Sequence, residues 1–232
     1  METKLEKFKT IANIVIDKME GGYYHPNMRL KNPKKFAAYG ASGETMYGID
    51  RKTGDAINKT VAGKKFWKLI DDADAKNKWQ WMYMGGDLKP QLIDLVVKII
   101  YPEFIYLSNK YLSKKAQELI FQDPRLLFHF IYATWNGSGW FQKFGTDFSK
   151  KVNSGVNNLD DLVNYMNDLR TKEGLRSGSA PNRLIKQGGE KIKSFIESLK
   201  SINNIQSIAP IFITVIIITF FFVNKKLNHA NN

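Results

Sequence analysis

The 232-residue chain contains no cysteine, which excludes disulfide bonds and thiolate metal sites but leaves the cellular compartment open. Its three histidines form neither a His-x-x-x-His motif nor an acid–histidine pair, so nothing points to zinc. The aspartates at 71, 72 and 74 lack the loop glycine and the bidentate glutamate of a calcium site, and they are typical of a solvated helix end. There is no phosphate-binding glycine loop and no Ser-His-Asp arrangement. We therefore expect no metal and no cofactor.

The N-terminus also lacks the apolar segment and the small-residue cleavage site of a secretory signal peptide. Near the other end, residues 208–223 are sixteen in a row without a charge, and counting back to Ile205 gives nineteen. At ~1.5 Å per residue such a helix nearly spans a ~30 Å hydrocarbon core. The sequence thus predicts one C-terminal transmembrane helix. A buried core helix or strand pair is the alternative, because the run is rich in β-branched residues.

Lysine and arginine number 35 against 22 acids, a net charge of +13. This balance favours polyanionic partners, among them nucleic acid, anionic lipid and acidic cell-wall polymers. The lysines are scattered rather than gathered on one helix, so we expect no specific nucleic-acid binding. Lysines on both sides of the 208–223 run leave the orientation in a membrane open.

Helical periodicity dominates the rest of the chain. Apolar residues from Leu5 to Met19 recur at helical spacing behind a Thr3–Glu6 capping box, and Gly21-Gly22 ends the pattern. Further helices are expected in these ranges: a short one around 66–70, then 92–111 with a kink or break at Pro102, 126–135 opened by Asp123-Pro124, 160–172 and 190–201. The 126–135 segment is apolar nearly all round, which is typical of a helix at the centre of a domain, with Trp135 and His129 in the core.

One short β-hairpin is expected after the first helix. Thr45 to Ile49 has the composition of a strand, and we expect it to return after the turn at residues 51–54. In such a strand Glu44 and Met46 share one face, and Thr45 and Tyr47 share the other. The fold class is therefore mainly α, of the α+β kind, with a small hairpin.

Glu20 is the strongest catalytic candidate. On the last turn of a helix it lies at the negative end of the helix dipole, and nearby aromatic residues can shield it from water. Both effects raise the pKa of a carboxyl group, as a general acid requires. An ordinary surface glutamate is the alternative. His25, five residues later, is either a substrate contact or a loop histidine without a role.

Two motifs resemble a known family. Met19-Glu20-Gly21-Gly22-Tyr23 and Gly43-Glu44-Thr45-Met46-Tyr47-Gly48-Ile49 resemble the paired signatures of phage-type N-acetylmuramidases, the secretion-activator proteins of the lysozyme-like superfamily (glycoside hydrolase family 108). The segment ending Trp135-Asn136-Gly137-Ser138-Gly139 looks like the family's Asn-x-Gly turn, and Asn182-Arg183 is similar to the pair that opens its last helix.

The resemblance implies a lysozyme-like domain over residues 1–200. After it, composition predicts a linker over 201–207, the transmembrane helix over 208–223 and a polar tail over 224–232. The resemblance makes Glu20 the catalytic acid. The substrate-binding residues it implies, together with the candidate His25, are Tyr23, His25, Gly43, Thr45, Tyr47, Asn136 and Arg183.

The resemblance does not identify the second catalytic group, because the chain has no acid between Glu20 and Glu44, where the family has one. Glu44 ranks slightly ahead of Asp50 for this role, with Thr45 orienting water in either case. A third option is that Glu20 acts alone, as in a lytic transglycosylase.

The function expected from the sequence is cleavage of peptidoglycan between N-acetylmuramic acid and N-acetylglucosamine by a membrane-anchored enzyme. A bacteriophage suits this topology, either in a virion membrane beside other virion proteins or in the host membrane before lysis. The alternative is a catalytically inactive, lysozyme-like protein that binds the wall or has a structural role in a virion membrane.

Overall fold

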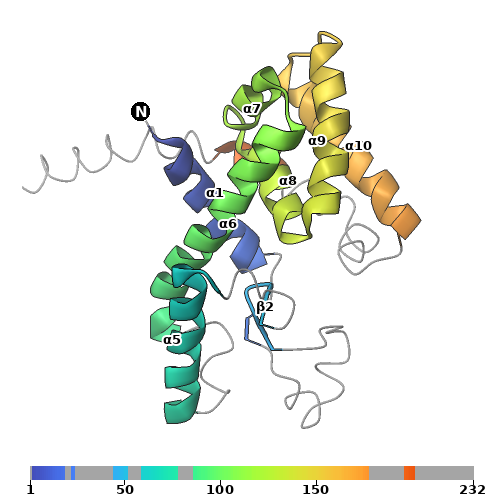
Figure 1. Cartoon of the computed structure of the whole chain (residues 1–232). Coiled ribbons are helices and arrows are strands. Elements are labelled where there is room, and N and C mark those ends of the chain that lie inside the picture. The colour runs from blue at the N-terminus through green and yellow to red at the C-terminus, as the bar shows by residue number, and fades with distance from the viewer. Residues whose placement is uncertain are drawn as a thin grey trace, which may run out of the picture. The chain divides into compact units, whose positions relative to one another are not determined.

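The computed structural model of the chain describes residues 2–18, 22–23, 44–51, 59–77, 86–177 and 196–201. The chain divides into two compact units, Met1–Lys172 and Glu173–Asn232. The first unit is mainly helical and contains a small two-stranded hairpin, as the sequence predicts (Figure 1).

Helix α1 spans Lys4–Lys18 and begins with the predicted capping box. The backbone N–H of Glu6 donates to Oγ1 of Thr3 at 3.2 Å, and the N–H of Thr3 donates to Oε2 of Glu6 at 2.7 Å. The two bonds satisfy donors that a helix start leaves unpaired. One face of α1 is buried through Phe8, Ile11, Ala12, Val15 and Ile16.

The hairpin consists of β1 (Thr45–Met46) and β2 (Ile49–Asp50), paired antiparallel with Thr45 opposite Asp50 and Met46 opposite Ile49. The predicted hairpin is present, but the expectation of a strand through Ile49 that turns after residue 51 is wrong. The chain turns at Tyr47 and Gly48, whose φ angles are 51° and 72°. Positive φ at both central residues suits the right-handed twist of paired strands, and glycine adopts it without strain.

Helices α5 and α6 come next in the described part of the chain. Helix α5 spans Val61–Asn77, and after the short 3₁₀ turn Gly86–Leu88 comes α6, Lys89–Tyr111. The prediction for Pro102 was a kink or a break, and the break is absent, because α6 continues through the proline. Packing explains why the lost backbone hydrogen bond is tolerated, since α6 contacts α1, α5, α8 and α9 along its length.

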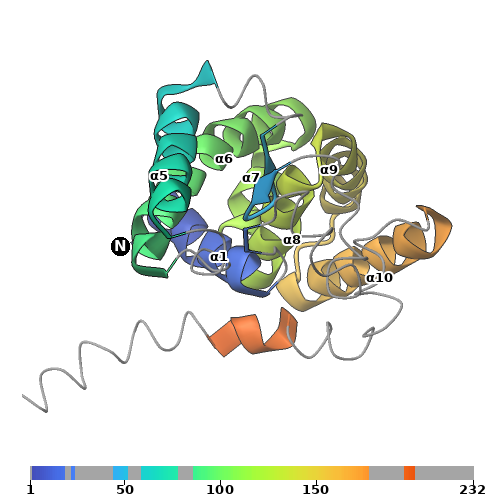
Figure 2. The ribbon, with the colours of Figure 1, turned by 90° about the horizontal axis from the view of Figure 1, so that it is seen from below.

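Helix α8 (Pro124–Trp135) lies among its neighbours, and every residue from Pro124 to Thr134 is buried, which confirms the predicted central helix. Asp123 is its predicted N-cap, accepting a hydrogen bond from the N–H of Arg125. Helices α1, α7 (Lys114–Ile120) and α9 (Ser138–Asn153) pack against α8 (Figures 1 and 2).

Helix α9 was not among the helices expected from the sequence. It begins directly after the turn at Asn136 and Gly137 that ends α8, so the glycines at 137 and 139 conceal its start. Its buried residues Phe141, Phe144, Phe148 and Val152 nevertheless follow helical spacing. Helix α10 runs from Leu159 to Ser177 and includes the predicted 160–172 range.

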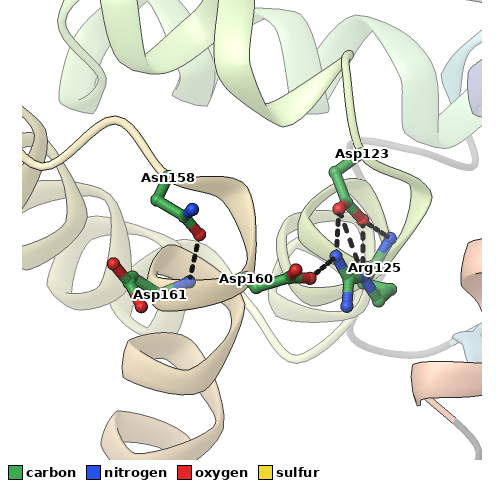
Figure 3. Close-up of polar contacts among 5 residues, drawn as sticks. All are labelled: Asp123, Arg125, Asn158, Asp160 and Asp161. Atoms are coloured by element: carbon green, nitrogen blue, oxygen red, sulfur yellow. Dashed lines mark hydrogen bonds and ion pairs between the residues drawn. The ribbon is translucent and has the colours of Figure 1, made fainter.

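Arg125 forms a buried ion-pair cluster at the start of α8. Its guanidinium contacts Asp123 through Nε and a terminal nitrogen, and the same terminal nitrogen lies 2.6 Å from Asp160 at the start of α10 (Figure 3). Asn158 caps α10 by accepting from the N–H of Asp161. The arginine thereby joins the beginnings of two helices that are distant in sequence, and burial of both Arg125 and Asp123 makes the loss of the Asp123 carboxylate costly.

A second polar cluster lies within the core, around the fully buried His129, which confirms the expectation of a core histidine. Nδ1 of His129 accepts from Nε of Arg170 at 3.1 Å, so Nε2 carries the proton that faces Oδ1 of Asn167 at 3.1 Å. Burial, with the positive charge of Arg170, holds the pKa of His129 well below its usual value. Burial also lowers the pKa of Arg170, to about 10.

In the second unit the structure describes the end of α10 and residues 196–201, which are helical and close with the 3₁₀ turn Leu199–Ser201. This agrees with the end of the predicted 190–201 helix, whose first residues lie outside the described ranges. The 208–223 run and residues 202–207 of the linker also lie outside them. None of the helices within the described ranges is long and apolar enough to cross a membrane.

The neutral state of His129 predicts acid sensitivity. Below the ordinary histidine pKa of 6.5 the unfolded chain binds a proton at this residue that the folded chain does not, so the free energy of unfolding falls as the pH decreases. Between pH 6 and pH 5 we expect the free energy of unfolding of the wild type to fall more steeply than that of His129→Gln. The difference in slope should approach about 1.4 kcal/mol per pH unit. Urea unfolding of both proteins across this window measures it, and parallel pH profiles would contradict it.

Candidate functional site

The hairpin is where the structure brings the sequence-predicted residues together. Tyr23, five residues after the end of α1, donates its hydroxyl proton to Oε1 of Glu44 at 2.7 Å. At the other side of the hairpin, Nε1–H of Trp135 at the end of α8 donates to the backbone oxygen of Tyr47 at 2.8 Å. The hairpin is thus tied both to the segment that follows α1 and to the α8–α9 junction.

Glu44 has both carboxylate oxygens engaged. Besides the Tyr23 hydroxyl on Oε1, a terminal nitrogen of Arg51 lies 2.9 Å from Oε2, and the backbone N–H of Arg51 donates to the backbone oxygen of Glu44 at 2.9 Å. The Glu44 side chain is only 13% exposed. A buried carboxylate held on both oxygens is well suited to fixing its neighbours and poorly placed to attack a sugar carbon.

Arg51 extends the contact to helix α5. Its other terminal nitrogen lies 2.6 Å from Asp71, and its guanidinium stacks 4.4 Å from the ring centre of Trp67. A guanidinium can bind two carboxylates at once because its donors form a rigid planar fork. Arg51 therefore joins Glu44 of the hairpin to α5, and the Asp71 predicted as a solvated helix end takes part in this contact.

Thr45 and Asp50 face each other across the two strands, and both are half-buried. Directly opposite residues in an antiparallel pair point to the same side of the sheet, while Met46 and Ile49 are buried on the other. The predicted sharing of a face by Thr45 and Tyr47 is wrong, because Tyr47 lies in the turn. Thr45 and Asp50 are thus cross-strand neighbours on one side of the hairpin.

Tyr23 and Tyr47 are both buried, with exposed fractions of 1% and 0%. Burial raises the pKa of Tyr47, and the negative charge of Asp17 on α1 raises it further. The Tyr47 hydroxyl is therefore neutral at physiological pH and close to the end of α1. In this structure the two rings support the hairpin from within and offer a ligand no exposed face.

Asn136 ends helix α8. Its Nδ2 donates to the backbone oxygen of Tyr132 at 2.7 Å, and Gly137, with φ of 103°, leads directly into α9. The amide side chain is half-buried and committed to this cap. Asn136 thus helps to fix the junction beside Trp135.

Four predicted site residues lie outside the described ranges: Glu20, His25, Gly43 and Arg183. Within those ranges, no group of three or more His, Asp or Glu residues is arranged to hold a metal ion.

Sequence reasoning missed Arg51, Trp67 and Trp135 as parts of this site. The sequence pattern places Arg51 in a predicted turn and the two tryptophans in apolar helical segments. The available signal for Arg51 was its position directly after Asp50. Because Thr45 pairs with Asp50, the next pair of opposite residues is Glu44 and Arg51.

Arg51→Lys tests the link between hairpin and α5. Lysine keeps the charge but has one compact donor group, so it cannot hold Glu44 and Asp71 in the same geometry or stack as well on Trp67. We expect a loss of about 1–2 kcal/mol in the free energy of unfolding by urea. The matched control Lys68→Ala removes the exposed ion pair with Asp72 on α5 and should cost less than about 0.5 kcal/mol. Equal losses would contradict the link.

The chain matches no protein-family model, and neither a curated protein nor a solved structure is significantly similar to it. The muramidase resemblance therefore rests on the quoted motifs, and a functional assignment has to be argued from the residues at the hairpin.

Proposed function

We propose that the protein is a lysozyme-like N-acetylmuramidase that cleaves the glycan strand of peptidoglycan between N-acetylmuramic acid and N-acetylglucosamine. The observation that supports this best is the hydrogen bond from Tyr23 to Glu44. Tyr23 ends the motif that contains Glu20, and Glu44 belongs to the hairpin motif. Residues from the two signatures that resemble the muramidases are thus in direct contact.

In the proposed reaction Glu20 protonates the bridging oxygen of the glycosidic bond. A second group then stabilises the positive charge that develops at the sugar carbon or activates a water molecule. Glu44 and Asp50 are the two carboxylates proposed for this role: Glu44 is bound by Tyr23 and Arg51 through its two oxygens, and Asp50 lies opposite Thr45 in the hairpin. Thr45 would orient the water. Without such a group, the sugar's own hydroxyl would attack, as in a lytic transglycosylase.

The net charge of +13 supports this substrate class. Peptidoglycan and its associated polymers are anionic, and long-range attraction would concentrate a basic enzyme on them. We further propose that the 208–223 run anchors the protein in a lipid membrane, either of a phage virion, beside other virion proteins, or of the host before lysis.

A non-enzymatic function is the second candidate, that of a wall-binding or structural membrane protein in a virion. The observation that favours it is the Glu44–Arg51 ion pair, which neutralises one of the two carboxylates available as a partner for Glu20. In this case the surface around the hairpin would bind glycan without cleaving it.

The proposed acid is tested by Glu20→Gln. The amide cannot donate a proton to the leaving oxygen, so clearing of a cell-wall gel should fall by at least about a hundredfold, with the melting temperature nearly unchanged. Glu118→Gln, at an exposed glutamate of α7, is the matched control and should stay active. Product analysis of the wild type separates the mechanisms: reducing ends indicate hydrolysis, anhydro ends indicate transglycosylation, and intact strands contradict the enzyme proposal. Lysis by Glu20→Gln would contradict the role of Glu20.

The anchor is tested by flotation with liposomes. The full chain should float with the vesicles at high salt, where electrostatic attraction is screened, and a chain that ends at residue 204 should not. Flotation of the shortened chain under these conditions, or failure of the full chain to float, would contradict a C-terminal anchor.

A further inference from the structure

The lysines near the start of helix α6 have acidic partners. Lys89 contacts Asp17 of α1 at 2.6 Å, and Asp94 contacts both Lys9 of α1 at 2.9 Å and Lys98 at 2.7 Å. Each positive charge is therefore compensated by a carboxylate of the protein. Little positive potential is left in this region to attract an anionic ligand.

The opposite holds where α6 ends and α7 begins. Lys110, Lys114 and Lys115 are exposed there, and none of them forms an ion pair with an acid in the described ranges. Glu118, the nearest acid in the sequence, is exposed and pairs with neither lysine of α7. On α9, Lys150 is likewise exposed and has no acidic partner within the part of the chain that the structure describes.

Ser149 of α9 brings these lysines together. Its hydroxyl accepts from the backbone N–H of Ser113 at 3.0 Å and donates to the backbone oxygen of Tyr111 at 3.3 Å. Gly145, one turn earlier on α9, lies so close to α6 that a Cβ added to it would be 3.2 Å from Cβ of Tyr111. The chain neighbours of the three hydrogen-bonded residues are lysines, at positions 110, 114 and 150. Their side chains therefore start from one small region of the surface.

Tyr106 adds an aromatic ring to this region. It is 55% exposed, and it is the one exposed aromatic side chain among the described residues. Lys110 follows it by four positions, on the same face of α6, and Nζ of Lys110 lies 3.5 Å from the Tyr106 hydroxyl and 5.2 Å from the ring centre of Tyr111. Hydrogen bonds to the hydroxyls of Tyr111 and Tyr106 raise the pKa of Lys110. The exposed ring is thus held beside a cation that stays charged at physiological pH.

We propose that this surface, which we call the α6–α7 surface, binds the glycan strand of peptidoglycan through Tyr106, Lys110, Lys114, Lys115 and Lys150. The face of a sugar ring presents C–H groups of partial positive charge, which the negative face of an aromatic ring attracts. The carboxylates of the lactyl and peptide groups on the strand complement the unpaired lysines. The choice of glycan rests on the proposed function. The surface lies on other elements than the hairpin, so it holds the polymer and takes no part in cleaving it.

Cosedimentation of the full chain, in mild detergent, with purified peptidoglycan sacculi tests this surface. The Glu20→Gln background and a temperature of 4 °C keep the sacculi intact during the measurement. Lys114→Gln/Lys115→Gln should raise the Kd about three- to tenfold, because it removes two unpaired cations. Tyr106→Ala should raise the Kd by a similar factor of about three to ten, because the stacking face is lost.

Lys64→Gln/Lys65→Gln is the matched control. Both lysines are exposed on α5 and have no ion pair within the described residues, so this variant loses the same net charge at another place. Its Kd for sacculi should change less than about twofold. Equal losses in the two double variants would show that net charge alone governs binding, and would overturn the proposal.

Two further probes test the choice of ligand. Polyphosphate has charge but no ring to stack, so Tyr106→Ala should leave its binding unchanged, and an equal loss on polyphosphate and sacculi would overturn the stacking role. A single-stranded oligodeoxynucleotide offers both rings and charge. If the variants of the α6–α7 surface weaken oligonucleotide binding more than binding to sacculi, the surface is a nucleic-acid site and the proposal is wrong.

Binding and cleavage are measured separately, so the two proposals can fail separately. A wild type that leaves glycan strands intact but binds sacculi through Tyr106 and the lysines contradicts the proposed function and supports the α6–α7 surface. A wild type that cleaves the strands, with binding that none of these variants weakens, supports the proposed function and overturns the surface.

Discussion

Helix α8 has no face for solvent, and this constraint governs much of the first unit. A helix that is apolar all round must be surrounded, so α1, α6, α7 and α9 all pack against it. Its polar groups must then find partners inside the protein. Arg125 finds its partners at the start of α8, and His129 finds them in the middle of the helix. Trp135 is the last residue of α8, and its indole N–H donates to the hairpin. The hairpin is thus held against the same helix on which the core is built.

The contacts around Glu44 show how a largely buried carboxylate is kept paired. Its two oxygens face a phenol and a guanidinium, so the desolvated carboxylate is paired and hydrogen-bonded. The guanidinium is in turn shared with a second carboxylate at Asp71 and stacked on an aromatic ring. Removing one member leaves the others with an unpaired partner, which is why the cluster should respond to substitution as a unit.

The sequence predicts the helices where capping residues and apolar periodicity indicate the same boundaries. It predicts the site only in part. The Thr3–Glu6 capping box and the Asp123 cap are short-range hydrogen-bonding patterns, and the structure contains both. Helix α9 was missed because the glycines at 137 and 139 indicate a loop and a helix start equally well. The turn at Tyr47 was missed for a different reason, because a tyrosine with left-handed φ is rare and is maintained here by burial and by the bond to Trp135.

The partners of the site residues could not be predicted, because they come from distant segments. The sequence named Glu44 and Tyr23 as members of two motifs, but the bond between them joins positions 21 residues apart, which no local pattern specifies. The pairing of Arg51 with Asp71 likewise depends on the placement of α5. Charge pairing of this kind has no periodicity, so a single sequence contains no pattern that indicates it.

The shortness of the hairpin also has a consequence for the order of folding. Strands of two residues have too few hydrogen bonds to be stable alone, and an isolated hairpin is marginal even when longer. Its stabilising contact with Trp135 spans 88 residues, so closing that loop has to follow or accompany the docking of α8. We therefore expect the hairpin to reach its native geometry with or after the docking of α8, not before it.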